Sequence, residues 1–194
     1  DITDACSIDQ AIEVGVKQFG SVDACVNAAY PRTEAWGTPF EELKMDDLQE
    51  NLRLQLGGAI ILSQRMMQHF VSQTHGNFIH ISSILGLAIP KFEHYEGTSM
   101  TSPIEYSAVK SGIISMTGWL AKYYKNKNIR VNCVSPGGIL DQQPQTFLEN
   151  YRDSCTSKGM LDPTDVAGTV LFLLSDQSKY INGQNIVVDD GWSL

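Results

Sequence analysis

The feature that most constrains this fold is the alternation of short apolar runs with longer segments of helical periodicity. Strands that are apolar throughout, and not only at every second residue, are typical of a parallel sheet covered by helices on both faces. The sequence therefore predicts one α/β domain over residues 1–194, with a doubly wound parallel sheet. The predicted strands are residues 23–28, 77–82, 129–134 and 185–188, and the predicted helices are residues 8–19, 45–74, 105–124 and 163–174.

Local signals predict the starts of two of these helices. Ser7 and Gln10 have the spacing of a capping box, which predicts Ser7 as the N-cap of the first helix and a buried stripe that ends at Phe19. Asp162 followed by Pro163 predicts the start of the last helix, because Asp is favoured at the N-cap and Pro at the first helical position.

Composition argues against several classes of function. The 194 residues carry a formal net charge of −8, which argues against a broad surface for nucleic acid. No apolar run has the length of a membrane span, and no secretory signal is visible. The cysteines and histidines lack the spacing of a metal site. We therefore expect a cytoplasmic protein without a metal, which acts on a small molecule and binds neither nucleic acid nor membrane.

Residues with catalytic potential lie between positions 77 and 110. A predicted strand ends at Ser82 and Ser83, and the helix that follows carries Tyr106 and Lys110. A tyrosine and a lysine four residues apart lie on one helix face, one turn from each other. A nearby cation lowers the pKa of a phenol, which then becomes a usable general acid and base. A serine hydroxyl at the strand end can hold a substrate carbonyl or hydroxyl against that phenol.

A second tyrosine–lysine pair shows that this spacing alone is weak support. Tyr123 and Lys127 have the same separation, within a run rich in lysine and asparagine. Such a run favours a solvated helix end, whose cations suit the negative end of the helix dipole. We expect no function for this second pair.

The order of strand, serine pair and Tyr-x-x-x-Lys helix resembles the short-chain dehydrogenase/reductase family over almost the whole chain. The resemblance implies a Rossmann-like fold, a homodimer or homotetramer, and hydride transfer between NAD or NADP and a carbonyl or secondary alcohol. It assigns catalysis to Ser83, Tyr106 and Lys110. Ser83 would orient the substrate oxygen, Tyr106 would exchange its proton, and Lys110 would also hold the cofactor ribose.

Two further segments resemble cofactor-binding segments of the family. Asp1 and Ile2 match the segment after the third strand, where an Asp lies near the adenine. Pro136, Gly137 and Ile139 match a turn whose backbone contacts the nicotinamide carboxamide. The glycine-rich turn that binds the pyrophosphate has no counterpart here. We expect a complete protein to carry about 60 more residues before Asp1, with the first strands and the charge that selects NAD or NADP.

The end of the first predicted strand matches the family only in part. Asn27 and Ala29 agree with its N-N-A-G pattern, and the resemblance places both beside the cofactor. Ala28 and Tyr30 depart from the pattern. Because a tyrosine cannot follow every conformation that a glycine adopts, we expect Tyr30 to line the substrate side.

The long helix carries the second departure. Alignment on Gly58 puts Gln55 where the family has a catalytic Asn, on a stripe that faces inward. Its amide then needs hydrogen-bond partners. Two interpretations stay open: a member of a proton relay that holds a water near Lys110, or a buried structural amide.

The segments around the predicted site point to the substrate. Residues 89–99, which include His94, make the chain between Ser83 and Tyr106 longer than is usual in the family. A loop beside an active site commonly sets substrate choice. The alternative is a surface loop without a function. Residues 141–160 are the expected substrate lid. With the Gln55 helix, these segments resemble a sub-branch linked to flagellin modification and acidic-sugar biosynthesis, which implies a sugar or sugar-phosphate substrate.

A different class of function stays open on the sequence. The missing glycine turn and Gln55 also suit a non-catalytic Rossmann-like scaffold, or a regulatory homodimer without cofactor turnover. Binding of a nicotinamide cofactor would distinguish the two classes.

Overall fold

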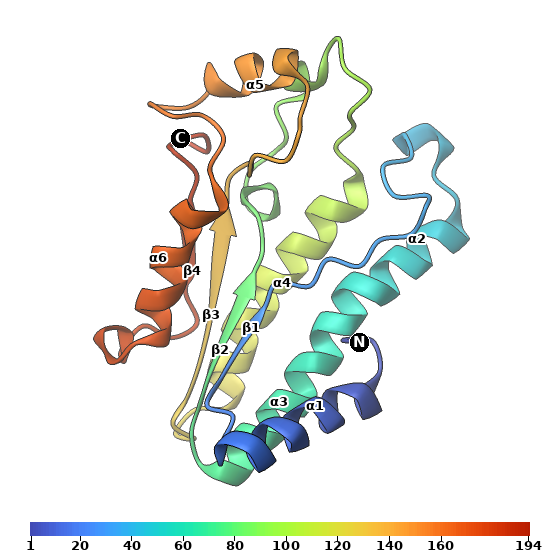
Figure 1. Ribbon diagram of the computed structural model, residues 1–194. Coiled ribbons are helices and arrows are strands. Elements are labelled where there is room, and N and C mark those ends of the chain that lie inside the picture. The colour runs from blue at the N-terminus through green and yellow to red at the C-terminus, as the bar shows by residue number, and fades with distance from the viewer.

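The computed structural model describes residues 1–194 and contains one sheet of four parallel strands (Figure 1). The strands stand in the spatial order β1-β2-β3-β4, and each neighbouring pair is parallel. This confirms the predicted parallel α/β architecture. The strands are β1 (Ala24–Asn27), β2 (Gly76–Ile81), β3 (Ile129–Pro136) and β4 (Asn185–Val188).

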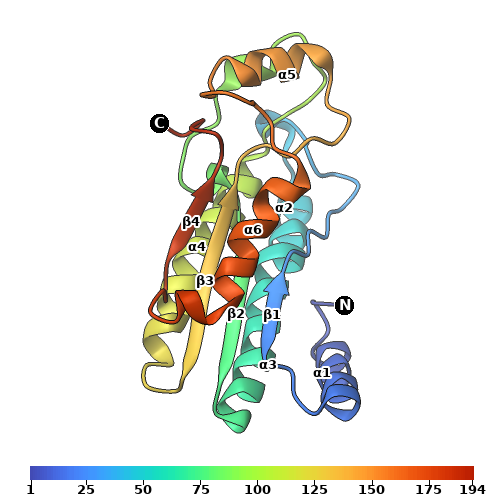
Figure 2. The ribbon, with the colours of Figure 1, turned by 60° about the vertical axis from the view of Figure 1, so that its left-hand side comes forward.

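Helices cover both faces of the sheet (Figure 2). Phe78 of β2 packs against α3 and α4, whereas the next residue, Ile79, packs against α6 on the opposite face. Because successive side chains of a strand point to opposite faces, a strand covered on both sides is apolar throughout. The helices are α1 (Ala5–Phe19), α2 (Met45–Leu52), α3 (Gly58–Gln73), α4 (Ile104–Tyr123), α5 (Gln145–Arg152) and α6 (Pro163–Leu174).

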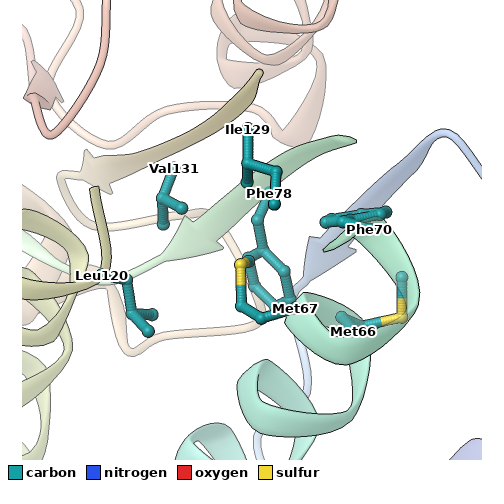
Figure 3. Packing of buried hydrophobic residues seen from close by; sticks show 7 residues of the cluster. All are labelled: Met66, Met67, Phe70, Phe78, Leu120, Ile129 and Val131. Carbon is teal, nitrogen blue, oxygen red and sulfur yellow. The ribbon is translucent and has the colours of Figure 1, made fainter. Parts of the chain in front are cut away.

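The largest core cluster lies between the sheet and the pair α3 and α4 (Figure 3). Its strand residues come from the first half of β2 and β3, so this core lies toward the amino ends of the strands. Each large apolar side chain buried here contributes about 2 kcal/mol. The packed amino half supports the carboxyl ends, where the loops begin. The cluster consists of Met66, Met67, Phe70, Phe78, Leu120, Ile129 and Val131.

The first helix corrects one prediction. α1 begins at Ala5, not at Ile8, because its N-cap is Asp4 and not Ser7: the Asp4 side chain accepts the N–H groups of Cys6 (3.0 Å) and Ser7 (3.3 Å). Phe19, the predicted end of the buried stripe, is 75% exposed. The predicted start of α6 is confirmed: it begins at Pro163.

Two further differences concern segments near the predicted site. The predicted long helical region forms from Met45 to Gln73, but a π-helical turn, Arg53–Gly57, lies within it between α2 and α3. The predicted lid contains a helix of its own, α5, which the sequence did not indicate. None of the helices combines the length and the apolar character needed to cross a membrane.

Candidate active site

A cavity of about 300 Å³ opens at the carboxyl edge of the sheet. The segments that follow β1, β2 and β3 all line it, together with the first turns of α4. In open α/β sheets this edge is where ligands bind. A larger hollow of about 930 Å³ lies at the amino ends of β2 and β3, but none of the predicted site residues lines it. The chemistry therefore belongs to the smaller cavity.

The cavity brings together six of the residues predicted from the sequence, from three separate segments. All of them line its wall, whereas Asp1 and Ile2 line a separate hollow. The six are Ser83, Tyr106, Lys110, Pro136, Gly137 and Ile139.

The two serines after β2 have different tasks. Ser82 is buried, and its hydroxyl donates to the carbonyl oxygen of Lys110 at 2.8 Å, which ties the strand end to α4. The Ser83 oxygen accepts the N–H of Leu85 at 3.2 Å, as the cap of the short 3-10 turn Ile84–Gly86. This bond orients the Ser83 hydroxyl and leaves its proton for another acceptor.

Tyr106 stands in the first turn of α4, whose N-cap is Pro103. Burial raises the pKa of the Tyr106 phenol above its ordinary value of 10, and the neighbouring Ser83 hydroxyl acts in the opposite direction. Tyr95 adds to the increase. The phenol therefore holds its proton at neutral pH, as the acid in a reduction must.

Lys110 lies one helical turn after Tyr106 and is only 6% exposed. Its Nζ donates to the carbonyl oxygen of Ile81 at 3.2 Å and lies 5.5 Å from the centre of the Tyr106 ring. No carboxylate forms an ion pair with it. Burial lowers the pKa of Lys110 to about 8.

These values correct the predicted electrostatics of the pair. Burial of the phenol outweighs the predicted lowering by Lys110, so the pKa of Tyr106 lies above its ordinary value and not below it. The same low-dielectric surroundings that would strengthen the attraction also disfavour both charged forms.

A glycine permits the close approach of the Ser83 turn to α4. A Cβ at Gly86 would stand 2.7 Å from the backbone carbon of Lys110, closer than real side-chain atoms come. The Ser111 hydroxyl donates to the Gly86 carbonyl oxygen at 2.7 Å and fastens the two segments. The turn and the helix therefore hold Ser83 beside Tyr106.

The predicted nicotinamide turn follows β3 directly. Gly137 continues the sheet by donating its N–H to Val188 at 2.8 Å, and Gly138 donates to the Tyr151 hydroxyl oxygen at 2.6 Å. Ile139 forms an isolated parallel bridge with Leu161. The turn is thus held from the β4 side and from the α5 side.

Asn27 and Ala29 do not line the cavity; their neighbours Ala28 and Tyr30 do. The Asn27 side chain is buried, accepts the N–H of Ala29 at 3.3 Å, and donates to Nδ1 of His80 at 3.5 Å. Asn27 therefore acts from behind the turn, by holding the backbone that presents Tyr30.

Asp1 and Ile2 lie apart from the other predicted residues, in a hollow formed with α1. The Asp1 carboxylate accepts the N–H and the hydroxyl of Thr3, at 2.8 and 2.9 Å. Ile2 packs close to Gly58 at the start of α3. The structure does not bring this segment to the catalytic cavity.

Gln55 is inward, as predicted, and lies in the π-helical turn. The side chain is 5% exposed, and neither atom of its amide has a hydrogen-bond partner in the protein. It does not line the cavity. Single π turns within helices are frequent at functional sites, so both interpretations of Gln55 stay open.

The two predicted substrate segments meet over the cavity. Nε2 of His94, in the inserted loop, lies 2.9 Å from the Ser154 hydroxyl oxygen after α5, so a hydrogen bond links the loop to the predicted lid. Phe147 and Tyr151 of α5 line the cavity, and Trp192 stacks on Tyr151 with ring centres 5.7 Å apart. Sequence reasoning missed Trp192, because no local pattern connects the end of the chain with this loop.

Comparison with known proteins agrees with this geometry. A family model described as Enoyl-(Acyl carrier protein) reductase matches residues 1–193. The post-translational flagellin modification protein A of Campylobacter coli is 48% identical over 195 residues, which cover 100% of this chain and 76% of that protein. The 7alpha-hydroxysteroid dehydrogenase of Bacteroides fragilis is 32% identical, with 99% of this chain and 72% of that protein covered.

A solved structure shows the same fold. A short chain dehydrogenase from Leptospira borgpetersenii serovar Hardjo-bovis, with bound NAD+, superposes with a TM-score of 0.90 at 33% identity, and the match covers 100% of this chain and 74% of that one. The carboxyl-edge cavity, the family match and these relatives lead to one conclusion. This chain belongs to the short-chain dehydrogenase/reductase family of oxidoreductases, in the branch that includes the Campylobacter flagellin modification protein.

Proposed function

We propose that Ser83, Tyr106 and Lys110 are the catalytic residues of an NAD(P)-dependent oxidoreductase that interconverts a carbonyl and a secondary alcohol. The observation that carries the proposal is the convergence of these three side chains, from the turn after β2 and from α4, on one cavity. We place the protein in the cytoplasm, as a homodimer or homotetramer.

The surroundings of Lys110 fit the ribose of a nicotinamide cofactor. The ammonium group has three N–H donors, of which the Ile81 carbonyl accepts one. The side chain is almost fully buried and lines the cavity, so the other donors suit hydroxyl groups there. The Leptospira relative was solved with NAD+. When bound, the nicotinamide supplies or accepts the hydride; either NAD or NADP fits this proposal.

In the reducing direction, the substrate oxygen gains negative charge as its carbon gains the hydride. The Ser83 hydroxyl, held by Leu85, donates a hydrogen bond to that oxygen. Tyr106 transfers its phenolic proton to the same oxygen. The positive charge of Lys110 stabilises the phenolate that remains. In the oxidising direction the phenolate takes the proton back.

The wall of the cavity supports a sugar or sugar-phosphate as substrate. Aromatic rings of Tyr95, Tyr151 and Trp192 line it beside the Ser83 and Tyr106 hydroxyls. A sugar ring presents apolar faces and a rim of hydroxyls, which suit rings with polar tips. A steroid dehydrogenase among the relatives shows that family membership alone does not choose the substrate. Turnover of sugars or sugar-phosphates, with no turnover of a hydroxysteroid, would support this choice; the reverse result would contradict it.

The replacement Tyr106→Phe tests the catalytic proposal. It removes the transferable proton and keeps the ring, so turnover is expected to fall about 1,000-fold or more, while cofactor affinity measured by nicotinamide fluorescence stays within about threefold. Tyr123→Phe is the matched control, because Tyr123 lies on the same helix and is exposed. Retained turnover in Tyr106→Phe would exclude the assignment. Absence of cofactor binding by the protein would favour the scaffold.

A further inference from the structure

Tyr30 occupies a position that the proposed mechanism does not use. It follows β1 and lines the cavity with Ser83, Tyr106 and Lys110. Its φ is not in the left-handed region, so the bulky residue stands there without backbone strain. The chain thus places a large ring at the wall of the catalytic cavity at no conformational cost.

The Tyr30 ring is held by two other rings. It meets Tyr106 edge to face, with centres 5.6 Å apart and an interplanar angle of 73°. It also meets Trp36 at 5.5 Å and 88°, and Trp36 meets Tyr106 at 6.0 Å. Each ring therefore contacts the other two, in the arrangement that aromatic quadrupoles prefer. Trp36 supports Tyr30 from the side of the loop that follows β1.

The Lys110 ammonium lies against two of these rings. Its Nζ is 5.4 Å from the centre of Tyr30 and 5.5 Å from the centre of Tyr106. Its one hydrogen bond within the protein goes to the carbonyl oxygen of Ile81. A buried cation without a carboxylate needs such compensation, and the face of an aromatic ring provides it.

Two ionisable side chains close to Lys110, those of His80 and Cys133, supply no negative charge. His80 of β2 is neutral, because burial lowers its pKa to about 3. Cys133 of β3 keeps its proton, because burial raises its pKa to about 11. The rings and one carbonyl thus carry the electrostatic support of the ammonium group.

Tyr30 itself is not a second acid or base. Burial and the neighbouring Tyr106 raise its pKa, Glu105 adds to the increase, and Arg32 opposes it. A second cation lies near this ring, because the Arg32 guanidinium is 5.0 Å from its centre. The phenol stays neutral, and its ring is the part that acts.

We propose that Tyr30 is a positioning residue, whose ring holds the Lys110 ammonium beside Tyr106 and limits its contact with water. The inference rests on the proposed function, in which Lys110 supports the proton transfer of Tyr106. It concerns how this chain positions Lys110, by means of a tyrosine at position 30, where the pattern of the family has a glycine.

Three replacements separate the ring, its hydroxyl and its volume. Tyr30→Phe keeps the ring, and both the Lys110 pKa and kcat are expected to stay near wild type, within about twofold for kcat. Tyr30→Leu keeps apolar cover without a π face, which lowers the Lys110 pKa and reduces kcat about fivefold with little change in KM. Tyr30→Gly admits water, which raises the Lys110 pKa.

The pKa of Lys110 is measured by NMR of the protein with ¹³C-labelled lysine, with Lys110→Ala for assignment, so the readout does not need turnover. Tyr180→Leu is the matched control, because Lys179 lies 5.0 Å from that ring in an exposed contact. Thermal melting confirms that each variant folds. A wild-type Lys110 pKa in both Tyr30→Leu and Tyr30→Gly would overturn the inference. So would an effect of Tyr30→Phe as large as that of Tyr30→Leu. Failure of the proposed function would instead appear as wild-type protein without turnover.

Discussion

Two tyrosine–lysine pairs with the same spacing lie at opposite ends of α4. Tyr106 and Lys110 stand in its first turns, at the carboxyl edge of the sheet, where Lys110 is buried. Tyr123 is the last residue of the helix and is 67% exposed. Lys127 lies beyond it, after Asn126 has taken a left-handed conformation with φ 66°. The second pair therefore does not share a helix face.

The difference shows that the spacing of a tyrosine–lysine pair does not by itself give the pair a catalytic function. The first pair is next to the ends of β1, β2 and β3, and burial shifts the pKa of both its members. The second pair has the stacked Trp119 ring as a neighbour, with centres 4.7 Å apart, and stays at the surface. The position of the helix start relative to the sheet decides which pair can act.

The largest expected difference between the two pairs is in their contribution to turnover. Lys110→Met removes the charge beside Tyr106 and keeps most of the volume, so kcat/KM is expected to fall about 1,000-fold. Lys127→Met, the same change in the exposed pair, is expected to leave kcat/KM within about twofold. Steady-state kinetics with the natural substrate measures both. Equal losses in the two variants would show that burial does not distinguish the pairs.

The same replacement is expected to stabilise the fold. The Lys110 pKa is about 8 in the folded state against 10.5 as its ordinary value, so below pH 8 the buried charge opposes folding. Lys110→Met should therefore raise the free energy of unfolding at pH 7, by about 3 kcal/mol at most. The gain should shrink between pH 8 and 10.5, where the folded lysine loses its proton first. Urea denaturation at pH 7 and pH 10 tests this; an equal gain at both pH values would contradict it.

The smallest effects concern one glycine near each pair. A Cβ at Gly86 would press on the backbone of Lys110, so Gly86→Ala is expected to cost about 2 kcal/mol and to lower kcat by moving the Ser83 turn. Gly118 is inside α4, and a Cβ there meets no atom within 4 Å. Gly118→Ala is expected to add about 1 kcal/mol of stability, because alanine favours the helix. Thermal unfolding ranks the two; a stabilising Gly86→Ala would refute the close contact.

Much of the site could be predicted, because each of its segments carries a local sequence signal. Ser83 ends an apolar strand, and Tyr106 and Lys110 are one helical turn apart, so pattern alone placed them on neighbouring elements. Parallel strands then bring their carboxyl ends together, which predicts a shared edge before any contact is known. Gly137 and Ile139, which the family resemblance assigned to the nicotinamide turn, lie at that edge too.

Other features had no local signal. Trp192 reaches the cavity from the end of the chain by stacking on Tyr151, a contact between residues far apart in sequence. The π-helical turn around Gln55 interrupts a helix whose periodicity reads as continuous.

The sequence by itself determined the α/β class, the parallel sheet and the order of the catalytic segments, because periodicity and strand composition are properties of short stretches. The tertiary structure determined the pKa values of the site. It buries Lys110 and Tyr106 so deeply that desolvation outweighs their mutual attraction, and it packs the Tyr30 ring against both side chains. Burial depends on what distant segments pack over a residue, and no short stretch of sequence contains that information.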